Sequence, residues 1–214
     1  MVKPPVALCL AFGVKYNVLG NHGQPLRYSL GHPVLREREI IMKKTAEAVI
    51  VGGGVMGCSV LYHLAQLGMN KVALVEQDVL GSGSTGRSQA ILRMHYSNPI
   101  TAGMAWHSLK VFQDFNELVG YHSGYVKTGY VVIVGPEEKA PLEENVAMQR
   151  NLGIDTRMVS ADDLGELAPM LKADDIGGIA YEPQSGYADP YQVTTGYAQR
   201  AKELGAKIYL RCVA

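Results

Sequence analysis

The apolar residues in the central part of the chain form two short runs that flank one helical stretch. Residues 46–51 are a largely β-branched apolar run, and a second run covers residues 71–75. Between them, from about Val55 to Leu67, apolar side chains recur on one side of a helix. Short continuous apolar runs are typical of buried parallel strands, which a crossover helix connects. The pattern predicts a βαβ unit, and so an α/β fold with a parallel sheet.

The rest of the chain also alternates between helical and extended patterns. A helix is predicted from Pro99 to Val119, with a core-facing stripe of Met104, Ala105, Leu109, Phe112, Phe115 and Leu118. Ser160 with Asp163 predicts the capped start of a short helix that ends before Pro169. The remaining expectations are strands over 126–134 and 178–181, a strand-like turn at 155–159, helices at 137–151 and 191–204, and a third parallel strand at 207–213.

Residues 1–41 lack this regularity. The apolar run from Pro4 to Val14 is shorter than the roughly 20 residues that a membrane span needs, and no small-x-small cleavage site follows it. Residues 36–39, Arg-Glu-Arg-Glu, can be encoded almost entirely by purines and lie a few codons before Met42, as a translated ribosome-binding site would. Either Met42 is the natural start, or residues 1–41 are a genuine N-terminal extension.

The composition narrows the class of protein. Hydrophobic residues make up 47% and charged residues 19%, which suits a globular chain with a sizeable core. Twenty basic and twenty acidic side chains give a net charge of zero, which argues against nucleic-acid binding, since such domains carry a basic excess. Cys9, Cys58 and Cys212 are too scattered for a disulfide framework or a zinc site, and this favours reduced thiols in a cytoplasmic protein.

A glycine cluster follows directly after the first predicted strand. Gly52, Gly54 and Gly57 fit the spacing G-x-G-x-x-G at the start of the predicted helix. In such a turn the first glycine allows the tight bend, the second leaves room for a pyrophosphate, and the third lets helix and strand pack closely. Val55 and Met56 lie at the helix N-terminus, whose unpaired N–H groups attract phosphate. The cluster predicts dinucleotide binding, with an ordinary tight βα turn as the alternative.

Two further segments bear on the choice of dinucleotide. Glu76, with Gln77 beside it, ends the second predicted strand 24 residues after Gly52, where a carboxylate binds ribose hydroxyls and repels a 2′-phosphate. This favours FAD or NAD over NADP. The loop of residues 81–88 is too rich in glycine and hydroxyls for the next helix of a plain NAD domain, and its candidate cofactor contacts are Ser84, Arg87 and Ser88. The alternative for this loop is a solvated flexible segment.

In order along the chain, these motifs resemble the N-terminal half of the D-amino acid oxidase-like flavoproteins, which include sarcosine oxidase, dimethylglycine dehydrogenase and glycine oxidase. The resemblance covers about residues 44–214, and the chain looks most similar to the bacterial sarcosine oxidase β-subunit type. The resemblance rests on the glycine cluster, Glu76, residues 83–88, Gly186-Tyr187-Ala188-Asp189-Pro190 and Gly205-Ala206-Lys207-Ile208. It implies a Rossmann-like FAD-binding domain with a parallel sheet, interrupted by part of an α+β substrate domain. Residues 42–123 and 185–214 would form the FAD-binding domain, with Val213 near the cofactor. Residues 124–184 would form the inserted part of the substrate domain.

The same resemblance implies the reaction. The enzymes of this group oxidise the C–N bond of a small amine or amino acid by transferring a hydride to FAD, so the implied substrates are of the sarcosine, glycine or dimethylglycine type. Arg93 occupies about the place of the arginine that binds the substrate carboxylate, and a surface arginine is the alternative. His95 and Tyr96 would line the flavin site; a histidine with a purely structural role is the alternative. The resemblance also allows a homo- or hetero-oligomer.

The length of the chain shapes the last expectation. The sequence stops at Ala214, where the third parallel strand should be ending, so we expect the N-terminal portion of a longer enzyme whose C-terminal half is absent. Two alternatives remain at this stage: an NAD-dependent dehydrogenase, and a non-catalytic dinucleotide-binding fragment or subunit that needs another chain.

Overall fold

The computed structural model describes residues 45–171 and 176–214. The hypothesis that Met42 is the natural start concerns residues 1–41, which lie outside the described part. Within it, no helix is long and apolar enough to cross a membrane.

A three-stranded parallel sheet carries the first predicted motif. Its strands β1 (Ala48–Val51), β2 (Val72–Glu76) and β9 (Lys207–Leu210) lie in the order β1-β2-β9. Val49 pairs with Ala73, and Val75 pairs with Tyr209. Because β2 is central, all five of its residues are buried, as its continuous apolar run predicts. The predicted α/β class with a parallel sheet is confirmed.

Two helices cover one face of this sheet. Helices α1 (Val55–Gln66) and α6 (Pro190–Glu203) pack against each other and share a core with β2. The Tyr197 ring lies at its centre, with its centroid 5.3 Å from that of Tyr62 and 4.9 Å from that of Phe115. Asp189 caps α6 by accepting from the N–H groups of Tyr191 and Gln192.

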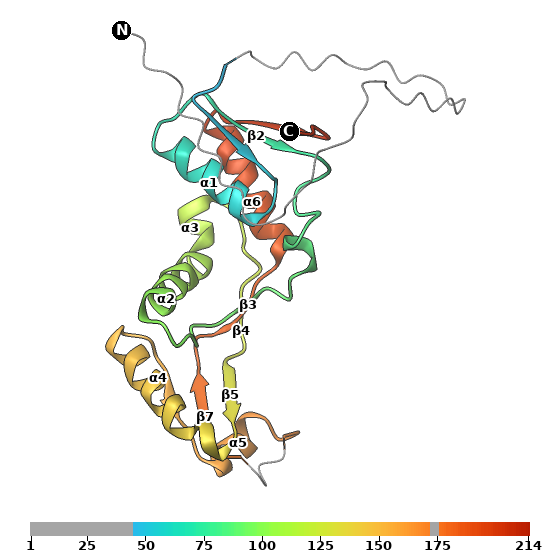
Figure 1. Ribbon diagram of the computed structural model, residues 1–214. Coiled ribbons are helices and arrows are strands. Elements are labelled where there is room, and N and C mark those ends of the chain that lie inside the picture. Colours follow the sequence, from blue (N-terminus) through green and yellow to red (C-terminus); the bar gives the residue numbers. More distant parts are fainter. Residues whose placement is uncertain (1–44, 172–175) are drawn as a thin grey trace, which may run out of the picture.

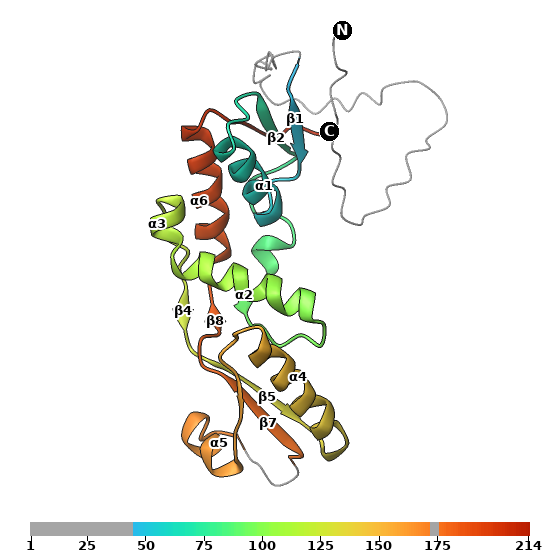
Figure 2. The ribbon, with the colours of Figure 1, turned by 90° about the vertical axis from the view of Figure 1, so that its left-hand side faces the viewer.

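The chain between β2 and β9 builds two antiparallel sheets. Strands β3 (Ile91–Leu92), β8 (Gly186–Tyr187) and β4 (Val126–Lys127) form a small sheet in the order β3-β8-β4. The other sheet has the order β5-β7-β6 and contains β5 (Tyr130–Val134), β7 (Gly178–Glu182) and β6 (Arg157–Met158). Figures 1 and 2 show an elongated molecule with the parallel sheet at one end and the β5-β7-β6 sheet, with α4 (Lys139–Asn151) and α5 (Ala161–Leu167), at the other.

The long helix predicted for residues 99–119 is broken. It consists of α2 (Pro99–Gln113) and α3 (Phe115–Val119), separated by Asp114. The Ser123 hydroxyl donates to the Phe112 carbonyl at 2.7 Å, and so satisfies an acceptor near the break. Because the helix is broken, the predicted stripe of core-facing residues is only partly buried. Leu109 and Phe115 are buried as expected, whereas Met104 and Leu118 are exposed.

The strand predicted for residues 126–134 is broken as well. Its two halves, β4 and β5, belong to different sheets because the chain turns at Gly129, whose φ is +76°. A Cβ atom at Gly129 would lie 2.6 Å from the Tyr181 ring, so this turn requires glycine. The third parallel strand is shorter than the predicted 207–213, because the backbone of Arg211 is left-handed, with φ +55°. The capped start of α5 is confirmed, since Ser160 and Asp163 form a reciprocal capping box.

Candidate functional site

The glycine turn joins β1 to α1 and brings the backbone of Gly57 close to that of Gly52. Gly52 has a φ of +104°, and its N–H donates to the Val75 carbonyl at 2.8 Å. A Cβ atom at Gly57 would lie 2.0 Å from the Gly52 carbonyl oxygen, so only glycine lets the helix approach the turn this closely. Gly54 is the N-cap of α1, and it contributes no side chain in front of the first helical turn. This end of α1 therefore fits a pyrophosphate, although the Val55 N–H, predicted to be unpaired, is paired with the Thr85 hydroxyl.

Glu76 lies beside this turn, at the end of β2. The residue is only 8% exposed, and its carboxylate accepts from two backbone N–H groups: that of Gly53 at 2.6 Å and that of Asp78 at 2.8 Å. Gly53 occupies the first x of the G-x-G-x-x-G spacing, where the motif allows any residue. It is therefore a site residue that the motif alone did not reveal. A Cβ atom there would lie 3.0 Å from the Glu76 Cβ. The carboxylate is fixed at the carboxyl end of the sheet's central strand, where a ribose would bind.

Cys58 packs behind the turn and is fully buried. Burial raises the pKa of its thiol to about 12, and the negative charge of Glu76 acts in the same direction. The thiol is therefore a small packing group, and its proton stays on the sulfur at neutral pH.

The loop of residues 81–88 folds back onto the turn. The Gly81 N–H donates to the Gly53 carbonyl at 2.9 Å, and the Thr85 hydroxyl accepts from the Val55 N–H at 3.0 Å. Thr85 opens a single 3₁₀ turn, η1 (Thr85–Arg87). It belongs to the site, although no sequence pattern distinguished it from its hydroxyl-bearing neighbours. The predicted contacts Ser84, Arg87 and Ser88 are all exposed.

The other predicted cofactor contacts lie around the same edge of the sheet. Met56 is 68% exposed in the first turn of α1, and Gln77 is exposed directly after Glu76. Val213 follows the end of β9 and is 81% exposed. Its neighbour Cys212 donates its N–H to the Glu76 backbone carbonyl at 2.9 Å, which brings the segment after β9 next to the end of β2. The structure therefore gathers residues from four separate segments at one place.

Arg93, His95 and Tyr96 follow β3 and form a second group. The Arg93 guanidinium donates to the His95 carbonyl and lies over two aromatic rings, with its Cζ atom 4.6 Å from the Tyr96 centroid and 5.9 Å from that of Tyr130. These contacts hold the guanidinium in one place, and its fork suits a carboxylate.

His95 reaches into a buried polar cluster that sequence reasoning missed. Its Nδ1 atom lies 3.7 Å from a Glu182 carboxylate oxygen and 3.3 Å from the Gln149 amide nitrogen. Burial lowers the pKa of the imidazole below 6.5; the charge of Arg93 acts in the same direction, whereas Glu182 and Gln149 oppose it. Glu182 and Gln149 are both fully buried. Because they lie 87 and 54 residues from His95 in the sequence, no local pattern could have connected them to it.

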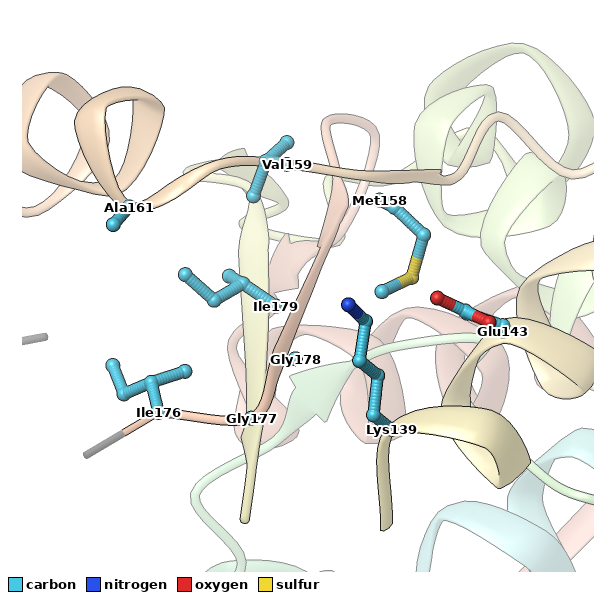
Figure 3. Close-up of a pocket in the computed structure, with 9 residues that line it drawn as sticks. All are labelled: Lys139, Glu143, Met158, Val159, Ala161, Ile176, Gly177, Gly178 and Ile179. Carbon is cyan, nitrogen blue, oxygen red and sulfur yellow. The ribbon is translucent and has the colours of Figure 1, made fainter. Parts of the chain in front are cut away.

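A pocket of about 270 Å³ lies elsewhere, at the β5-β7-β6 end of the molecule. Figure 3 shows the Lys139, Glu143 and Met158 side chains on one side of it and the Ile176 and Ile179 side chains on the other. None of the predicted site residues lines it. Among residues 45–171 and 176–214 there is also no group of three or more His, Cys, Asp or Glu side chains that could hold a metal ion.

Comparison with known proteins places this geometry in a family. The family model for FAD dependent oxidoreductases of the DAO type matches residues 47–214. The chain belongs to this family. The match confirms the resemblance inferred from the motifs, and it decides the choice between FAD and NAD in favour of FAD.

Individual relatives are similar at about 30% identity. The chain is 30% identical over 173 residues to the mitochondrial pyruvate dehydrogenase phosphatase regulatory subunit of Mus musculus, and 29% identical over 173 residues to the mitochondrial sarcosine dehydrogenase of the same organism. Each alignment covers 80% of this chain but only 20% and 19% of the relative. The chain thus spans about a fifth of the length of these curated relatives.

A solved structure shows the same fold. The crystal structure of glycine oxidase from Bacillus cereus superposes with a TM-score of 0.62 at 30% sequence identity, over 76% of this chain and 45% of that one.

Proposed function

We propose that this chain binds FAD and forms the FAD-binding part of an enzyme that oxidises the C–N bond of a small amine or amino acid. The observation that carries the proposal is the glycine turn with Glu76 beside it. Gly57 has no space for a side chain, and the Glu76 carboxylate is fixed by two backbone N–H groups at the edge of the sheet. The N-terminus of α1 would hold the pyrophosphate, and Glu76 the ribose.

The residues after β3 would act on the substrate side. Bound FAD would supply the acceptor for a hydride from the carbon beside the amine; loss of the hydride from the neutral amine leaves an iminium ion. Arg93 would bind the carboxylate of an amino-acid substrate through its fork, held by the contacts with Tyr96 and Tyr130. His95 and Tyr96 would line the same space. A substrate of the sarcosine, glycine or dimethylglycine type supplies both the carboxylate and the amine.

We also propose the division of the chain that this function needs. Residues 42–123 and 185–214 would form the FAD-binding domain, and residues 124–184 the inserted part of a substrate domain. The parallel sheet lies wholly within the first part and the β5-β7-β6 sheet wholly within residues 124–184, which supports this division, while the β3-β8-β4 sheet joins strands of both parts. The scattered cysteines support a cytoplasmic location.

The test is an absorption spectrum of the purified full-length protein, followed by anaerobic addition of sarcosine, glycine or dimethylglycine. We expect flavin bands near ~450 nm that bleach with at least one of them. In an Arg93→Lys variant the bands should remain while carboxylate-bearing substrates bleach them far more slowly, because lysine lacks the fork. An amine without a carboxylate serves as the matched control and should react equally with both proteins. A protein with no flavin after reconstitution would refute the proposal.

A non-catalytic role is the second candidate, and the similarity to a protein named as a regulatory subunit favours it. In that case FAD would bind through the same turn, but none of the amines would bleach it. The spectrum and the anaerobic mixing together therefore distinguish an enzyme from a regulatory flavoprotein.

A further inference from the structure

Glu182 has an oxygen that lacks a hydrogen-bond donor although it is fully buried. The residue ends β7, and its Oε2 atom accepts from the Met94 N–H at 3.0 Å and from the Ser185 hydroxyl at 2.7 Å. Within the described residues its Oε1 atom has no donor, and it faces the His95 Nδ1 atom at 3.7 Å. A buried acceptor without a partner costs free energy, so such an atom calls for an explanation.

Gln149, on α4, also has a buried side-chain oxygen without a hydrogen-bond donor among the described residues. Its Nε2 atom lies 3.3 Å from the same His95 nitrogen and 3.4 Å from the Tyr96 carbonyl oxygen. Its Oε1 atom is buried and has no partner in the part of the chain that the structure describes. A half-turn of the amide exchanges the two atoms and brings Oε1 to the imidazole, at the cost of the 3.4 Å hydrogen bond from Nε2 to the Tyr96 carbonyl oxygen. Two unpartnered buried oxygens, from two different elements, can therefore reach one titratable nitrogen.

A proton on the His95 Nδ1 atom would point to the Glu182 oxygen, which lies 3.7 Å away, just beyond hydrogen-bond distance, and to the Gln149 oxygen once that amide is turned. We propose that Glu182 and Gln149 are positioning residues for the substrate side of the site: they keep the proton of His95 on Nδ1, and Glu182 also fixes the segment that carries Arg93 through the Met94 N–H. This inference rests on the proposed function and deepens it.

The consequence concerns the other ring nitrogen. The charged groups that act on the imidazole are Glu182 from β7 and Arg93 from its own segment, whereas α4 contributes the neutral Gln149. Apolar residues of α2, including Ala102 and Leu109, pack against Met94. Burial keeps the imidazole pKa below its ordinary value, so the ring is neutral at physiological pH. With the proton held on Nδ1, Nε2 is left as an acceptor for an amine N–H.

The first readout requires neither flavin nor substrate. Deuterium exchange at the Cε1 position of each histidine, followed by mass spectrometry across a pH series, gives the imidazole pKa values in the full-length protein. Replacing Glu182 with glutamine keeps the size of the side chain and removes its charge. We expect Glu182→Gln to lower the pKa of His95 by about one or more, because a charge within 4–6 Å has an effect of that size. His63, His107 and His122 serve as internal controls and should not change.

Ser185→Ala is the matched control, because it removes a hydrogen bond from the same carboxylate but leaves the charge. It should lower the melting temperature while leaving the His95 pKa in place. Gln149→Leu provides a second test should Glu182→Gln fail to fold: it removes the other oxygen and should lower the same pKa. A His95 pKa in Glu182→Gln or Gln149→Leu equal to that of Ser185→Ala would overturn the proposal.

The second readout addresses the substrate side. Acetate, the simplest carboxylate, is titrated into the FAD-loaded protein while the flavin spectrum is recorded. Glu182→Gln should weaken acetate binding at least about tenfold, because a small misplacement of a carboxylate clamp is costly, whereas Ser185→Ala should stay near wild type. Equal acetate affinity in all three proteins would overturn the positioning role. A wild-type protein that holds no flavin would refute the proposed function instead, and the exchange measurement would still decide whether Glu182 and His95 are paired.

Discussion

Substituting Gly57 with alanine tests the glycine turn where it is tightest. The new Cβ atom would lie 2.0 Å from the Gly52 carbonyl oxygen and 3.3 Å from the Ile50 Cγ2 atom. The first contact is with backbone, so no rotation of a side chain can relieve it, and either the turn or the start of α1 must move. Overpacking of this kind costs about 1–3 kcal/mol. If the strain falls on the phosphate-binding geometry, that cost corresponds to about 5- to 150-fold weaker FAD binding.

The assay is a fluorescence titration of the FAD-free protein with FAD, together with a melting curve. Gly103→Ala is the control, because Gly103 lies inside α2 and a Cβ atom there meets nothing within 4 Å. Alanine should stabilise that helix by about 0.5–1 kcal/mol and leave FAD binding unchanged. A Gly57→Ala protein with wild-type FAD affinity and melting temperature would show that FAD binding does not depend on the close approach of Gly57 to the turn.

Three further predictions follow from single contacts. Glu76→Gln should weaken FAD binding by about 1.5–3 kcal/mol in the same titration, because hydrogen bonds to a charged carboxylate are lost or weakened; unchanged affinity would contradict its ribose role. Cys58 should stay unlabelled by iodoacetamide at neutral pH while the partly exposed Cys212 reacts, as peptide mass spectrometry can show, since the pKa of the Cys58 thiol is raised to about 12. Asp189→Ala should cost about 0.5–2 kcal/mol in a urea titration, because the α6 cap is lost. Hydrogen bonds, of which that from the Gln192 N–H has the largest effect, hold the pKa of Asp189 below 3.8. The stability that the ionised carboxylate adds is therefore present above pH 3.8 and is lost as the pH falls through the lowered pKa. Asp189→Asn should lack this pH dependence.

The elements that sequence alone predicted are those whose cause is local. The first apolar run, the glycine turn, the helix and the second strand follow one another along the chain. Each of them can be recognised from its own residues. The capped start of α5 is equally local, since Ser160 and Asp163 complete each other within one turn. The position of Glu76 beside the glycines also follows, because the two strands of a βαβ unit end at the same edge of the sheet.

The elements that it mispredicted depend on distant partners. The helix break at Asp114 is accompanied by the Ser123 hydroxyl on the Phe112 carbonyl, and the strand break at Gly129 by the packing of that glycine against Tyr181. Ser123 lies beyond the end of the predicted helix, and Tyr181 is far from Gly129 in the sequence, so neither residue is part of the apolar pattern that predicted these elements. Leu118 belongs to a continuous stripe only if the helix is unbroken, so its exposure follows from the same error.

Glu76 and Glu182 solve the same structural problem at two places. Each ends a strand, each is buried, and each accepts from a backbone N–H that is distant in sequence: Gly53, 23 residues away, and Met94, 88 residues away. A buried carboxylate is stable only when such donors are present, so each one fixes the segment that donates to it. Glu76 fixes the turn proposed to hold FAD, whereas Glu182 fixes the segment that carries Arg93. Their amide variants should therefore separate: Glu76→Gln should reduce FAD affinity, and Glu182→Gln should preserve it while weakening carboxylate binding. A single loss shared by both variants would mean that the two segments form one site with no division of roles.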